Sequence, residues 1–417
     1  MKKRLLFVTS RLPWPPNSGR KVSLYHYCRG LAERYGYEIA LFVFPEWDQP
    51  RDAAGKPPFI GEVRFAAPIS ALTKLVNLAT RVAFCRQPLQ CALYYSPKNR
   101  RLLRQLALEF DPDVILFDMI RVAPYMKGLV GKARCILDLD DLLSLRYERQ
   151  LAAFDDNTGI AGRYAGGMSR AAERLLCHGV VGRLILKSEQ KRLQRAELRY
   201  AKTADGVILV AEKETAYLNA LLGEPRAVTV PTGVGVYQTD QNRGKEKKPR
   251  TFGFIGNLHV AANEASLAHI VRDILPHIPR PFRFEVVGAV PKKLRERYGN
   301  VKELSFLGEI AELLPVITSW QICLCPIAFG TGLKTKVLDA MAAELAVVTN
   351  TVGADGIVAE RGREIFVFDD PVDIAACVGA LLADPTRCSE VGKLAKSFVL
   401  EHFSWERNFD AFQNLGL

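Results

Sequence analysis

The sequence predicts an α/β protein that contains two doubly wound parallel sheets, one after the other along the chain. Short apolar runs alternate with longer amphipathic segments, which is typical of parallel strands joined by helices. Several runs are almost continuously apolar, as expected for strands that are covered on both faces. The alternation stops at a polar and highly charged stretch, Gln241–Arg250, and then starts again. Two sheets of similar size therefore fit the chain better than one large sheet.

The first half of the chain supplies the elements of the first sheet. The expected strands are Arg4–Thr9, Glu38–Phe44, Val63–Phe65, Val114–Phe117, Cys135–Asp138 and Gly206–Val210. Helical periodicity between them predicts helices over Val22–Arg34, Asn99–Phe110 and Lys213–Leu222. Turn residues at Pro231–Gly233 end this part of the chain.

The second half supplies a similar set. Its expected strands are Thr251–Ile255, Phe282–Val287, Leu304–Phe306, Ile322–Pro326, Ala346–Thr349 and Ile365–Phe368. Its expected helices are Glu264–Ile274, Thr335–Ala343, Pro371–Ala383, Cys388–Glu401 and Trp405–Leu417. We therefore predict a first domain over 1–232 and a second over 233–402. The last helix, about 403–417, is expected to pack back on the first domain.

Length and composition exclude several classes of protein. The 417 residues are 48% hydrophobic and 24% charged, which excludes a mainly disordered chain and a collagen-like fibre. No apolar stretch approaches the roughly 18 residues that span a bilayer, and the run Leu5–Val8 is too short for a signal peptide. Nine scattered cysteines without a Cys-x-x-Cys pair fit a reducing compartment. We therefore expect a cytoplasmic protein, with Cys323 and Cys325 as core residues rather than metal ligands.

The chain is basic, with a formal net charge of +12. Such a balance suits phosphates, an anionic membrane or nucleic acid. Lys187–Tyr200 predicts a strongly basic helix, which is either a solvated face or a face for a membrane or an anionic substrate, and Leu72–Arg86 could be amphipathic. No helix-turn-helix, zinc-finger or RNA-binding pattern is present, so we expect no nucleic acid partner. Peripheral association with an anionic membrane, at the inner face of the cell membrane, is the remaining expectation for this charge.

The loop after the first strand, Thr9–Lys21, is long and cationic. It lacks the Gly-x-Gly-x-x-Gly pattern, which weighs against an NAD or FAD enzyme. Gly19 and Arg20 stand at a helix N-terminus at the carboxyl end of a strand, where open α/β sheets bind ligands and where anions are stabilised. We predict an anion site there, while the alternative is a simple turn.

The most informative stretch is Pro326–Ala342, which follows an apolar strand and opens a helix. Its glycines can present backbone N–H groups to an anion, its lysines add charge, and a carboxylate one turn later can accept hydrogen bonds from sugar hydroxyls. These residues are Gly330, Thr331, Gly332, Lys334, Lys336 and Asp339. The glycine spacing is not that of a Walker loop. The pattern predicts a site for the diphosphate and ribose of a nucleotide.

This stretch resembles the donor-binding segment of retaining glycosyltransferases of family 4, which have the two-domain GT-B fold. Phe254–Asn257, Leu304–Glu309 and Ala346–Ile357 resemble further family segments in the same order, and they add Gly256, Asn257 and Leu307 to the expected donor-binding residues. Leu12–Gly19, with Tyr25 and His26, resembles a bacterial exopolysaccharide-associated subgroup. The resemblance implies transfer of a sugar, with retention, from a UDP- or GDP-type donor to a glycan, lipid-linked or small-molecule acceptor. It implies no cofactor and no metal.

The sequence departs from the family pattern at two places. Many members carry two glutamates spaced Glu-x7-Glu, and here Thr331 and Asp339 occupy these positions. The Arg/Lys pair that many members place after the first strand of the second domain is replaced by Gly256–Val260. Phosphate contacts are therefore expected from Lys334, Lys336, Arg20 or backbone.

Two residues of the first domain are candidates for the chemistry. Asp118 ends an apolar strand and His26 lies on the first helix, and either is expected to position the acceptor rather than to act as a strong base. Asp138–Asp141 ends the next strand and could cap a helix, orient an acceptor hydroxyl or bind a divalent metal. The alternatives to a glycosyltransferase are a GT-B enzyme of the sugar-nucleotide epimerase kind, or a non-enzymatic protein that binds anionic surfaces or nucleic acid.

Overall fold

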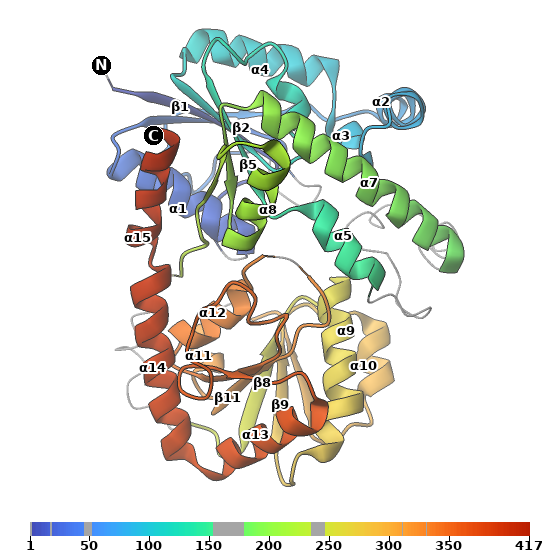
Figure 1. The fold of residues 1–417 in the computed structure, drawn as a ribbon, viewed down its shortest axis with the longest axis vertical. Helices are drawn as coiled ribbons and strands as arrows, with labels where there is room; N and C mark the ends of the chain where they lie inside the picture. Colours follow the sequence, from blue (N-terminus) through green and yellow to red (C-terminus); the bar gives the residue numbers. More distant parts are fainter. Residues whose placement is uncertain are drawn as a thin grey trace. The chain divides into compact units, whose positions relative to one another are not determined.

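The computed structural model describes residues 2–16, 19–45, 52–152, 179–234, 247–310, 312–330 and 332–417. Thr331 and most of the predicted linker lie outside these residues. The chain divides into two compact units (Figure 1). Unit 1 consists of Met1–Leu145, Ser188–Thr232 and Trp405–Leu417, and unit 2 consists of Arg146–Lys187 and Gly233–Ser404. Compared with the predicted boundaries at 232 and about 402, this division additionally assigns 146–187 to the second unit.

Unit 1 is built on a seven-stranded parallel sheet with the order β3-β2-β1-β4-β5-β6-β7. The strands are β1 Arg4–Thr9, β2 Glu38–Val43, β3 Val63–Phe65, β4 Val114–Asp118, β5 Arg134–Asp140, β6 Gly206–Leu209 and β7 Ala227–Thr229. Phe7 pairs with Leu41 on one side and with Leu116 on the other, and all three side chains are buried. The strand order reverses between β1 and β4, so the carboxyl ends of these two strands form the switch point of the sheet.

Helices connect the strands of unit 1. They are α1 Gly19–Glu33, α2 Ala71–Asn77 with its π-helical continuation η1 Leu78–Phe84, α3 Leu89–Tyr94, α4 Pro97–Phe110 and α8 Glu212–Leu222. Two longer connections, α5 Leu143–Ala152 and α7 Gly179–Thr203, are each divided between the two units. Local chemistry fixes the helix ends, as at α4, where the Ser96 hydroxyl accepts from Asn99 N–H at 3.4 Å and Pro97 occupies the first turn.

The last residues of the chain belong to unit 1. Helix α15, Trp405–Phe409, and the 3₁₀ turn that follows it, Asp410–Leu415, place their apolar side chains in the core of this unit. Tyr35 donates from its hydroxyl to the Phe409 carbonyl at 2.7 Å. A Cβ at Gly30 would lie 2.4 Å from the Phe409 ring, so glycine is required where α1 meets this segment.

Unit 2 repeats the architecture with six parallel strands in the order β10-β9-β8-β11-β12-β13. The strands are β8 Thr251–Ile255, β9 Arg283–Val287, β10 Leu304–Gly308, β11 Ile322–Cys325, β12 Ala346–Thr349 and β13 Phe366–Val367. The helices are α9 Ala261–His269 with its π-helical continuation Ile270–Ile274, α10 Lys292–Tyr298, α11 Leu314–Ile317, α12 Thr335–Ala342, α13 Pro371–Ala383 and α14 Pro385–Phe403. The order reverses between β8 and β11. The predicted α/β class with two parallel sheets is confirmed.

Burial in unit 2 follows the sequence prediction for β11. Cys323 and Cys325 are fully buried, and both are free thiols in the hydrophobic core. All eight cysteines that the structure describes are unpaired. Among the described helices, none is both long and apolar enough to cross a membrane.

Candidate active site

The carboxyl ends of β4 and β5 in unit 1 hold a buried cluster of charges around Arg20. Its Nε donates to Asp118 Oδ1 at 3.0 Å, its Nη1 donates to Asp140 Oδ1 at 3.0 Å, and its Nη2 donates to Asp138. The side chains of Arg20, Asp118 and Asp138 are almost completely buried, and Asp140 is 23% exposed. Arg20 therefore joins the first turn of α1 to two strand ends, and its charge is neutralised within the unit.

The end of β1 completes this cluster. Asp118 Oδ2 accepts from the Thr9 hydroxyl at 3.1 Å, from the Ser10 hydroxyl at 3.2 Å and from the Ser10 N–H at 3.3 Å. Burial alone would raise the pKa of Asp118, but Arg20 and then Arg11 lower it below its usual value. Asp118 is thus held as a carboxylate at the switch point, with its two oxygens bound to this chain.

The charges around Arg20 shift one another in opposite directions. Burial alone would lower the pKa of Arg20, but the three carboxylates, Asp138 first, raise it well above its usual value. Burial, together with Asp140 and Asp118, raises the pKa of Asp138 to about 7 against the opposing effect of Arg20. One guanidinium therefore stabilises the charge of three carboxyl groups.

Two residues at these strand ends have left-handed backbone, which is uncommon outside glycine. Met119, directly after β4, has φ 70°, and Asp140, the last residue of β5, has φ 66°. Such conformations cluster at functional sites. Asp140 is also the most exposed of the three carboxylates around Arg20.

His26 lies elsewhere on unit 1, two turns further along α1. Its ring stacks on Trp405 with centroids 4.6 Å apart and an interplanar angle of 11°. Burial, followed by the nearby Arg29, lowers the pKa of His26 to about 4. The imidazole is therefore neutral at physiological pH and packs against α15, which favours a packing role over the predicted role in catalysis.

The predicted donor loop of unit 2 lies between β11 and α12. Gly330 has φ 150° and Gly332 has φ 68°, conformations that favour glycine, and they direct the chain into the first turn of α12. Lys334 occupies the N-cap position, is 9% exposed, and donates from Nζ to the Gly332 carbonyl. Glycine backbone, a helix N-terminus and a lysine therefore meet within one short loop.

Lys336 joins this loop to the neighbouring β8–α9 turn. Its Nζ donates to Asn263 Oδ1 and lies 5.0 Å from the centre of the Phe254 ring. Asn263 in turn donates to the Asn257 carbonyl at 2.8 Å. Burial lowers the pKa of Lys336. Because β8 and β11 are the two strands at which the sheet order reverses, these contacts bring the predicted residues together at the switch point of unit 2.

The turn after β8 is packed backbone against backbone. A Cβ at Gly288, which has φ 132°, would lie 2.2 Å from the Gly256 carbonyl oxygen. Asn257 Oδ1 accepts from the His259 N–H at 2.9 Å, which fixes the turn. Glycine is therefore required at position 288, where the chain passes against Gly256, and Asn257 holds the turn after β8 through its bond to His259.

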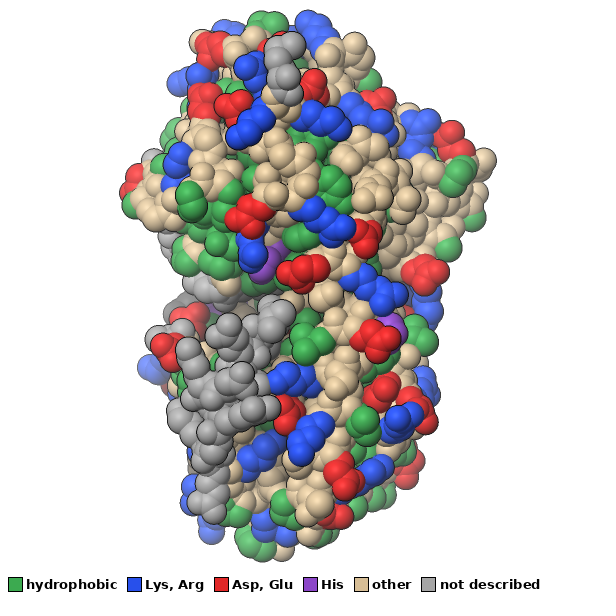
Figure 2. All heavy atoms as spheres, turned by 90° about the vertical axis from the view of Figure 1, so that its left-hand side faces the viewer, with side chains coloured by type: hydrophobic (Ala, Val, Ile, Leu, Met, Phe, Trp, Pro, Cys, Tyr) green, Lys and Arg blue, Asp and Glu red, His purple; other side chains and the backbone are tan. Residues whose placement is uncertain are grey.

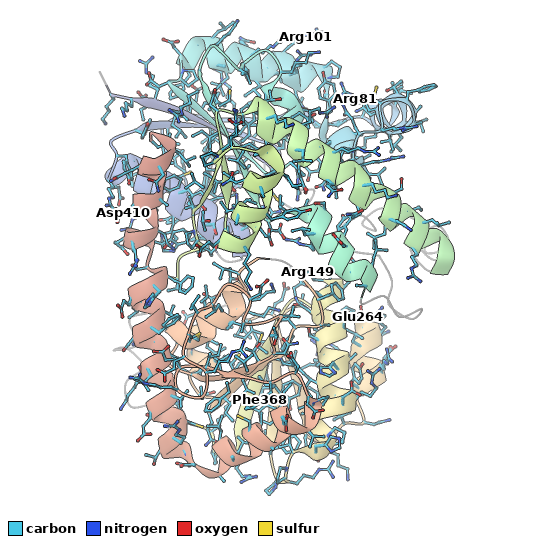
Figure 3. All side chains as sticks on the ribbon, in the orientation of Figure 1. Arg81, Arg101, Arg149, Glu264, Phe368 and Asp410 are labelled. Atoms are coloured by element: carbon cyan, nitrogen blue, oxygen red, sulfur yellow. The ribbon has the colours of Figure 1, made fainter. Side chains whose placement is uncertain are left out.

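Three polar residues that were not among the predicted site residues fix the same region. Asn350, after β12, accepts from the Ile327 and Gly353 N–H groups at 2.9 Å each, and its Nδ2 donates to the Ile327 carbonyl. Asn263 holds Lys336 as described above. Arg149 on α5 donates to the Gly330 carbonyl at 2.7 Å and to Asp355 at 3.2 Å (Figure 3). Their side chains determine the path of the donor loop.

The remaining predicted donor residues are more peripheral in the described structure. Leu307 lies on β10 and is 38% exposed, next to an irregularity in the pairing of β10 with β9. Asp339 lies on α12, one turn after its start, and is half-buried. Among the described residues, no group of three or more histidine, cysteine or acidic side chains is arranged to hold a metal ion.

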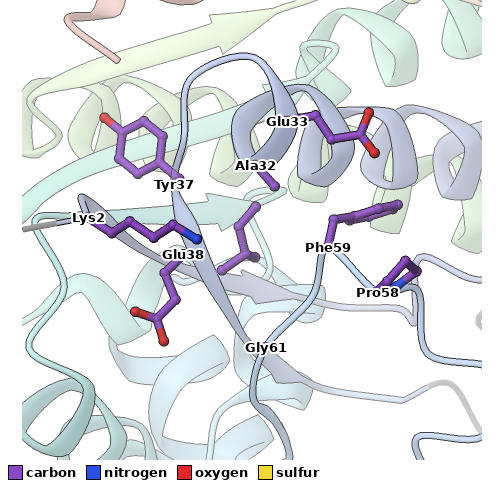
Figure 4. A pocket seen from close by; sticks show the side chains of 9 residues that line it. Lys2, Ala32, Glu33, Tyr37, Glu38, Pro58, Phe59 and Gly61 are labelled. Carbon is purple, nitrogen blue, oxygen red and sulfur yellow. The ribbon is translucent and has the colours of Figure 1, made fainter.

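A separate pocket in unit 1 does not involve these residues. It has a volume of about 260 Å³ and is lined by side chains that include Lys2, Glu33, Tyr37 and Phe59 (Figure 4). It lies at the amino end of β2, beside Glu38. Asp118 and Asp140 lie at the carboxyl ends of their strands, and the pocket lies at the amino end of β2 in the same parallel sheet. The pocket is therefore distinct from the candidate site.

Comparison with known proteins identifies the region that contains the donor loop. Residues 249–384 match the family described as glycosyl transferases group 1. This match covers about a third of the chain, and the matched region contains every donor-loop residue discussed above, from Gly330 to Asp339. The match confirms the predicted family resemblance and enzyme class.

One curated relative shares part of the sequence. It is an uncharacterized 44.6 kDa protein in the cps region of Klebsiella pneumoniae, 22% identical over 169 residues. The match covers 38% of this chain and 44% of the relative, so it spans less than half of either protein.

Solved structures share the fold over the whole chain. Sucrose-phosphate synthase from Thermosynechococcus elongatus has a TM-score of 0.69 at 15% identity, with 100% of this chain and 98% of that chain covered. Anabaena Alr3699/HepE, in complex with UDP and glucose, has a TM-score of 0.63 at 13% identity, with 99% and 98% covered. At such low identity these similarities concern the fold, and they confirm the predicted GT-B architecture of the chain.

Proposed function

We propose that the protein transfers a sugar from a nucleoside-diphosphate sugar to a hydroxyl of a glycan, lipid-linked or small-molecule acceptor, with retention of anomeric configuration, as in family 4. The observation that carries this proposal is the loop before α12. Gly330, Gly332 and Lys334 meet at a helix N-terminus at the switch point, inside the group 1 glycosyltransferase domain. Oriented N–H groups, a helix dipole and an ammonium group together favour a diphosphate.

The donor is proposed to be of the UDP type, with GDP as the alternative. HepE was solved with UDP, UDP and glucose, and UDP-glucose, which supports this choice by fold similarity. Asp339, one turn into α12, is proposed to accept hydrogen bonds from the ribose hydroxyls. Leu307 on β10, together with the turn at Gly256 and Asn257, is proposed to border the base and the sugar.

The chemistry follows from the charge that develops during transfer. Breaking the anomeric bond leaves negative charge on the departing diphosphate, and fixed N–H groups with Lys334 and Lys336 stabilise it as it grows. In retaining transfer, a diphosphate oxygen on the same face of the sugar helps to deprotonate the acceptor hydroxyl. No strong protein base is needed, and the proposal includes no metal ion. Asp140, supported by Arg20 and with Asp118 beside it, is proposed to orient the acceptor hydroxyl.

We further propose that the enzyme acts in the cytoplasm in the synthesis of cell-surface polysaccharide or another glycoconjugate. The unpaired cysteines and the partial similarity to a protein of a cps region support this setting. Within the described residues the chain carries no candidate membrane span, so any attachment to a membrane would be peripheral.

A thermal-shift screen with UDP-, GDP-, ADP- and dTDP-sugars tests the donor. A ligand at 100 times its dissociation constant stabilises the folded protein by about 2.7 kcal/mol, and we expect this effect for one nucleotide class. The stabilising donor is then incubated with glycan and lipid-linked acceptors, and the anomeric configuration of the product is determined by NMR. No stabilisation by any of the four classes would contradict the proposal. Nucleotide release without an acceptor would instead favour the epimerase alternative.

A further inference from the structure

The segment α2–η1 of unit 1 exposes an unusual number of large apolar side chains. Leu72 is 70% exposed, Leu75 64%, Val76 50% and Phe84 84%. Ala79 and Ala83 between them are also exposed. We call these six residues the apolar ridge. Isolated exposed apolar residues are ordinary, but a contiguous set marks an interaction surface.

The ridge results from a helix whose polar side faces the protein. Asn77 is buried, and its Nδ2 donates to the Ala92 carbonyl at 2.9 Å and to the Tyr95 carbonyl at 2.8 Å. The Cζ of Arg81 lies 3.3 Å from the centre of the Tyr95 ring, and its Nη1 donates to Gln87 Oε1 (Figure 3). Turning the apolar residues inward would break these contacts, so the exposure is fixed by specific interactions rather than by loose packing.

The π-helical winding of η1 aligns the two ends of the ridge. At the α-helical rotation of about 100° per residue, Phe84 would lie about 120° away from Leu72 around the axis. The wider i→i+5 bonds of η1, such as Cys85 N–H to the Thr80 carbonyl at 3.1 Å, turn the chain less per residue. Phe84 therefore lies on the same side as Leu72, Leu75 and Val76. Figure 1 shows α2 end-on at the periphery of unit 1.

The chain around the ridge carries one sign of charge. From Val63 to Leu108 the sequence contains no aspartate or glutamate and eight lysines and arginines. Lys74, Arg86, Lys98 and Arg101 are exposed. On the face shown in Figure 2, by contrast, basic and acidic side chains are interspersed. Absence of carboxylates over so long a segment matches a negatively charged partner.

A second basic surface lies on the unit 1 part of α7. Lys191, Arg195 and Arg199 recur at every fourth position and are exposed, while Glu189 and Glu197 point inward and are buried. The Glu189 carboxylate accepts from the Leu89 N–H at 2.6 Å and so joins α7 to α3, which packs against α2–η1. The carboxylates of this helix segment are thus withdrawn from the surface and its cations remain on it.

We propose that the apolar ridge inserts into the interface of an anionic phospholipid membrane, with the surrounding cations bound to lipid headgroups. Exposed leucine and phenylalanine side chains on one side of a helix, among cations and without carboxylates, are the composition of an interfacial membrane helix. A protein partner of ordinary surface composition would not require this exclusion of acidic residues. The proposal holds whether or not the acceptor is lipid-linked.

Vesicle flotation with the full-length protein tests the proposal. The probes are vesicles of phosphatidylcholine alone and vesicles of phosphatidylcholine with an equal part of phosphatidylglycerol. We expect binding to the anionic vesicles that decreases as salt is raised, because electrostatic attraction is screened. The triple variant Leu72→Gln, Leu75→Gln, Phe84→Gln should lose at least about tenfold in binding, since burial of several apolar side chains is removed.

A matched control separates the ridge from exposed apolar residues in general. The triple variant Leu221→Gln, Val358→Gln, Val372→Gln changes three side chains that are 43%, 89% and 53% exposed elsewhere, and it should bind like wild type. Both triple variants should keep the wild-type thermal shift with the UDP-sugar, which shows that the donor site is intact. Equal flotation of the ridge variant and wild type would overturn the proposal, as would equal binding to neutral and anionic vesicles at low salt. A wild-type dimer that the ridge substitutions dissociate, without any flotation, would assign the ridge to a second copy of the chain and also overturn it.

Discussion

The switch points of the two sheets both place basic side chains near the start of a helix, but these side chains have different bonding partners. In unit 1, Arg20 in the first turn of α1 is bound by three carboxylates from the ends of β4 and β5. In unit 2, Lys334 and Lys336 at the start of α12 donate to neutral oxygens, the Gly332 carbonyl and the Asn263 side chain. The bonds of a cation next to a helix N-terminus thus depend on the neighbouring groups, which include carboxylates in unit 1 and neutral oxygens in unit 2.

The pKa values of Arg20 and Lys336 shift in opposite directions, in line with this difference in partners. The carboxylates around Arg20 raise its pKa despite burial, whereas burial lowers the pKa of Lys336. A cation that is already neutralised has little to gain from an anionic ligand. A partly desolvated cation beside neutral oxygens gains a strong charge-assisted bond when a phosphate arrives. The comparison therefore favours a structural role for Arg20, and it supports the proposed donor-binding role of Lys336.

The largest effect is expected when Arg20 is removed. Arg20→Ala leaves Asp118, Asp138 and Asp140 without their shared cation, and breaking such a buried pair costs about 3–5 kcal/mol of unfolding free energy. Urea denaturation followed by circular dichroism measures the loss. The control Arg29→Ala removes an arginine that pairs with Glu33 on the exposed face of α1 and should cost less than about 1 kcal/mol. If Arg20→Ala has wild-type stability but has lost donor affinity, Arg20 binds the donor and its proposed structural role is wrong.

Glu197 provides a second test in unit 1, because it is a buried carboxyl group held by Ser144 rather than by Arg20. Glu197 on α7 accepts from the Ser144 N–H at 3.1 Å and from its hydroxyl at 2.5 Å, and burial raises its pKa to about 7 from 4.5. Between these values the folded state binds the proton and the unfolded state does not, so this group lowers stability as pH rises. Glu197→Gln should therefore gain stability relative to wild type from pH 4.5 to 7, by up to about 3 kcal/mol.

Melting temperatures of both proteins across this pH range provide the measurement. Glu148→Gln, at an exposed position of α5, controls for the loss of one charge. A difference between Glu197→Gln and wild type that does not change with pH would show that the carboxyl is not protonated in the fold.

The smallest effect in free energy is expected at the donor loop. Lys334→Ala removes a charge-assisted phosphate bond worth about 1.5–3 kcal/mol, so donor affinity should fall roughly 10- to 150-fold. Isothermal titration with the nucleotide sugar measures the affinity, and denaturation should show a much smaller change in stability. The matched control Lys292→Ala, at an exposed position of α10, should bind like wild type. Unchanged affinity of Lys334→Ala would place the diphosphate elsewhere.

The sequence was sufficient for every described strand except β7, Ala227–Thr229, which was not predicted, and for the position of the donor loop. β1 and β8 have the predicted bounds, because a short apolar run between turn residues has few other structures available. The loop at Gly330–Lys336 was recognisable because glycines, lysines and a helix start are adjacent in the chain. The donor-binding role of these residues stays a prediction.

The partners of side chains far apart in sequence could not be predicted. Arg20, Asp118 and Asp138 meet because β1, β4 and β5 are consecutive strands of the sheet, and strand order is not visible in a single apolar run. The same holds for Asn263, which reaches Lys336 across 73 positions. For α2–η1 the pattern indicated an amphipathic segment, but which side faces the solvent depends on the bonds of Asn77 to carbonyls of α3 and the residue after it.

The position of Trp405–Leu417 determines the order in which the units can be completed during translation. This segment leaves the ribosome after all of unit 2, yet Phe409 and Phe412 belong to the core of unit 1, where Phe412 packs on Tyr27 at 5.1 Å. Until this segment emerges, Tyr27 lacks its contact with Phe412, and Gly30 on α1 lacks its contact with the Phe409 ring. Unit 1 therefore begins first along the chain but is completed after unit 2, and its nascent form exposes an apolar surface until residues 405–417 have emerged.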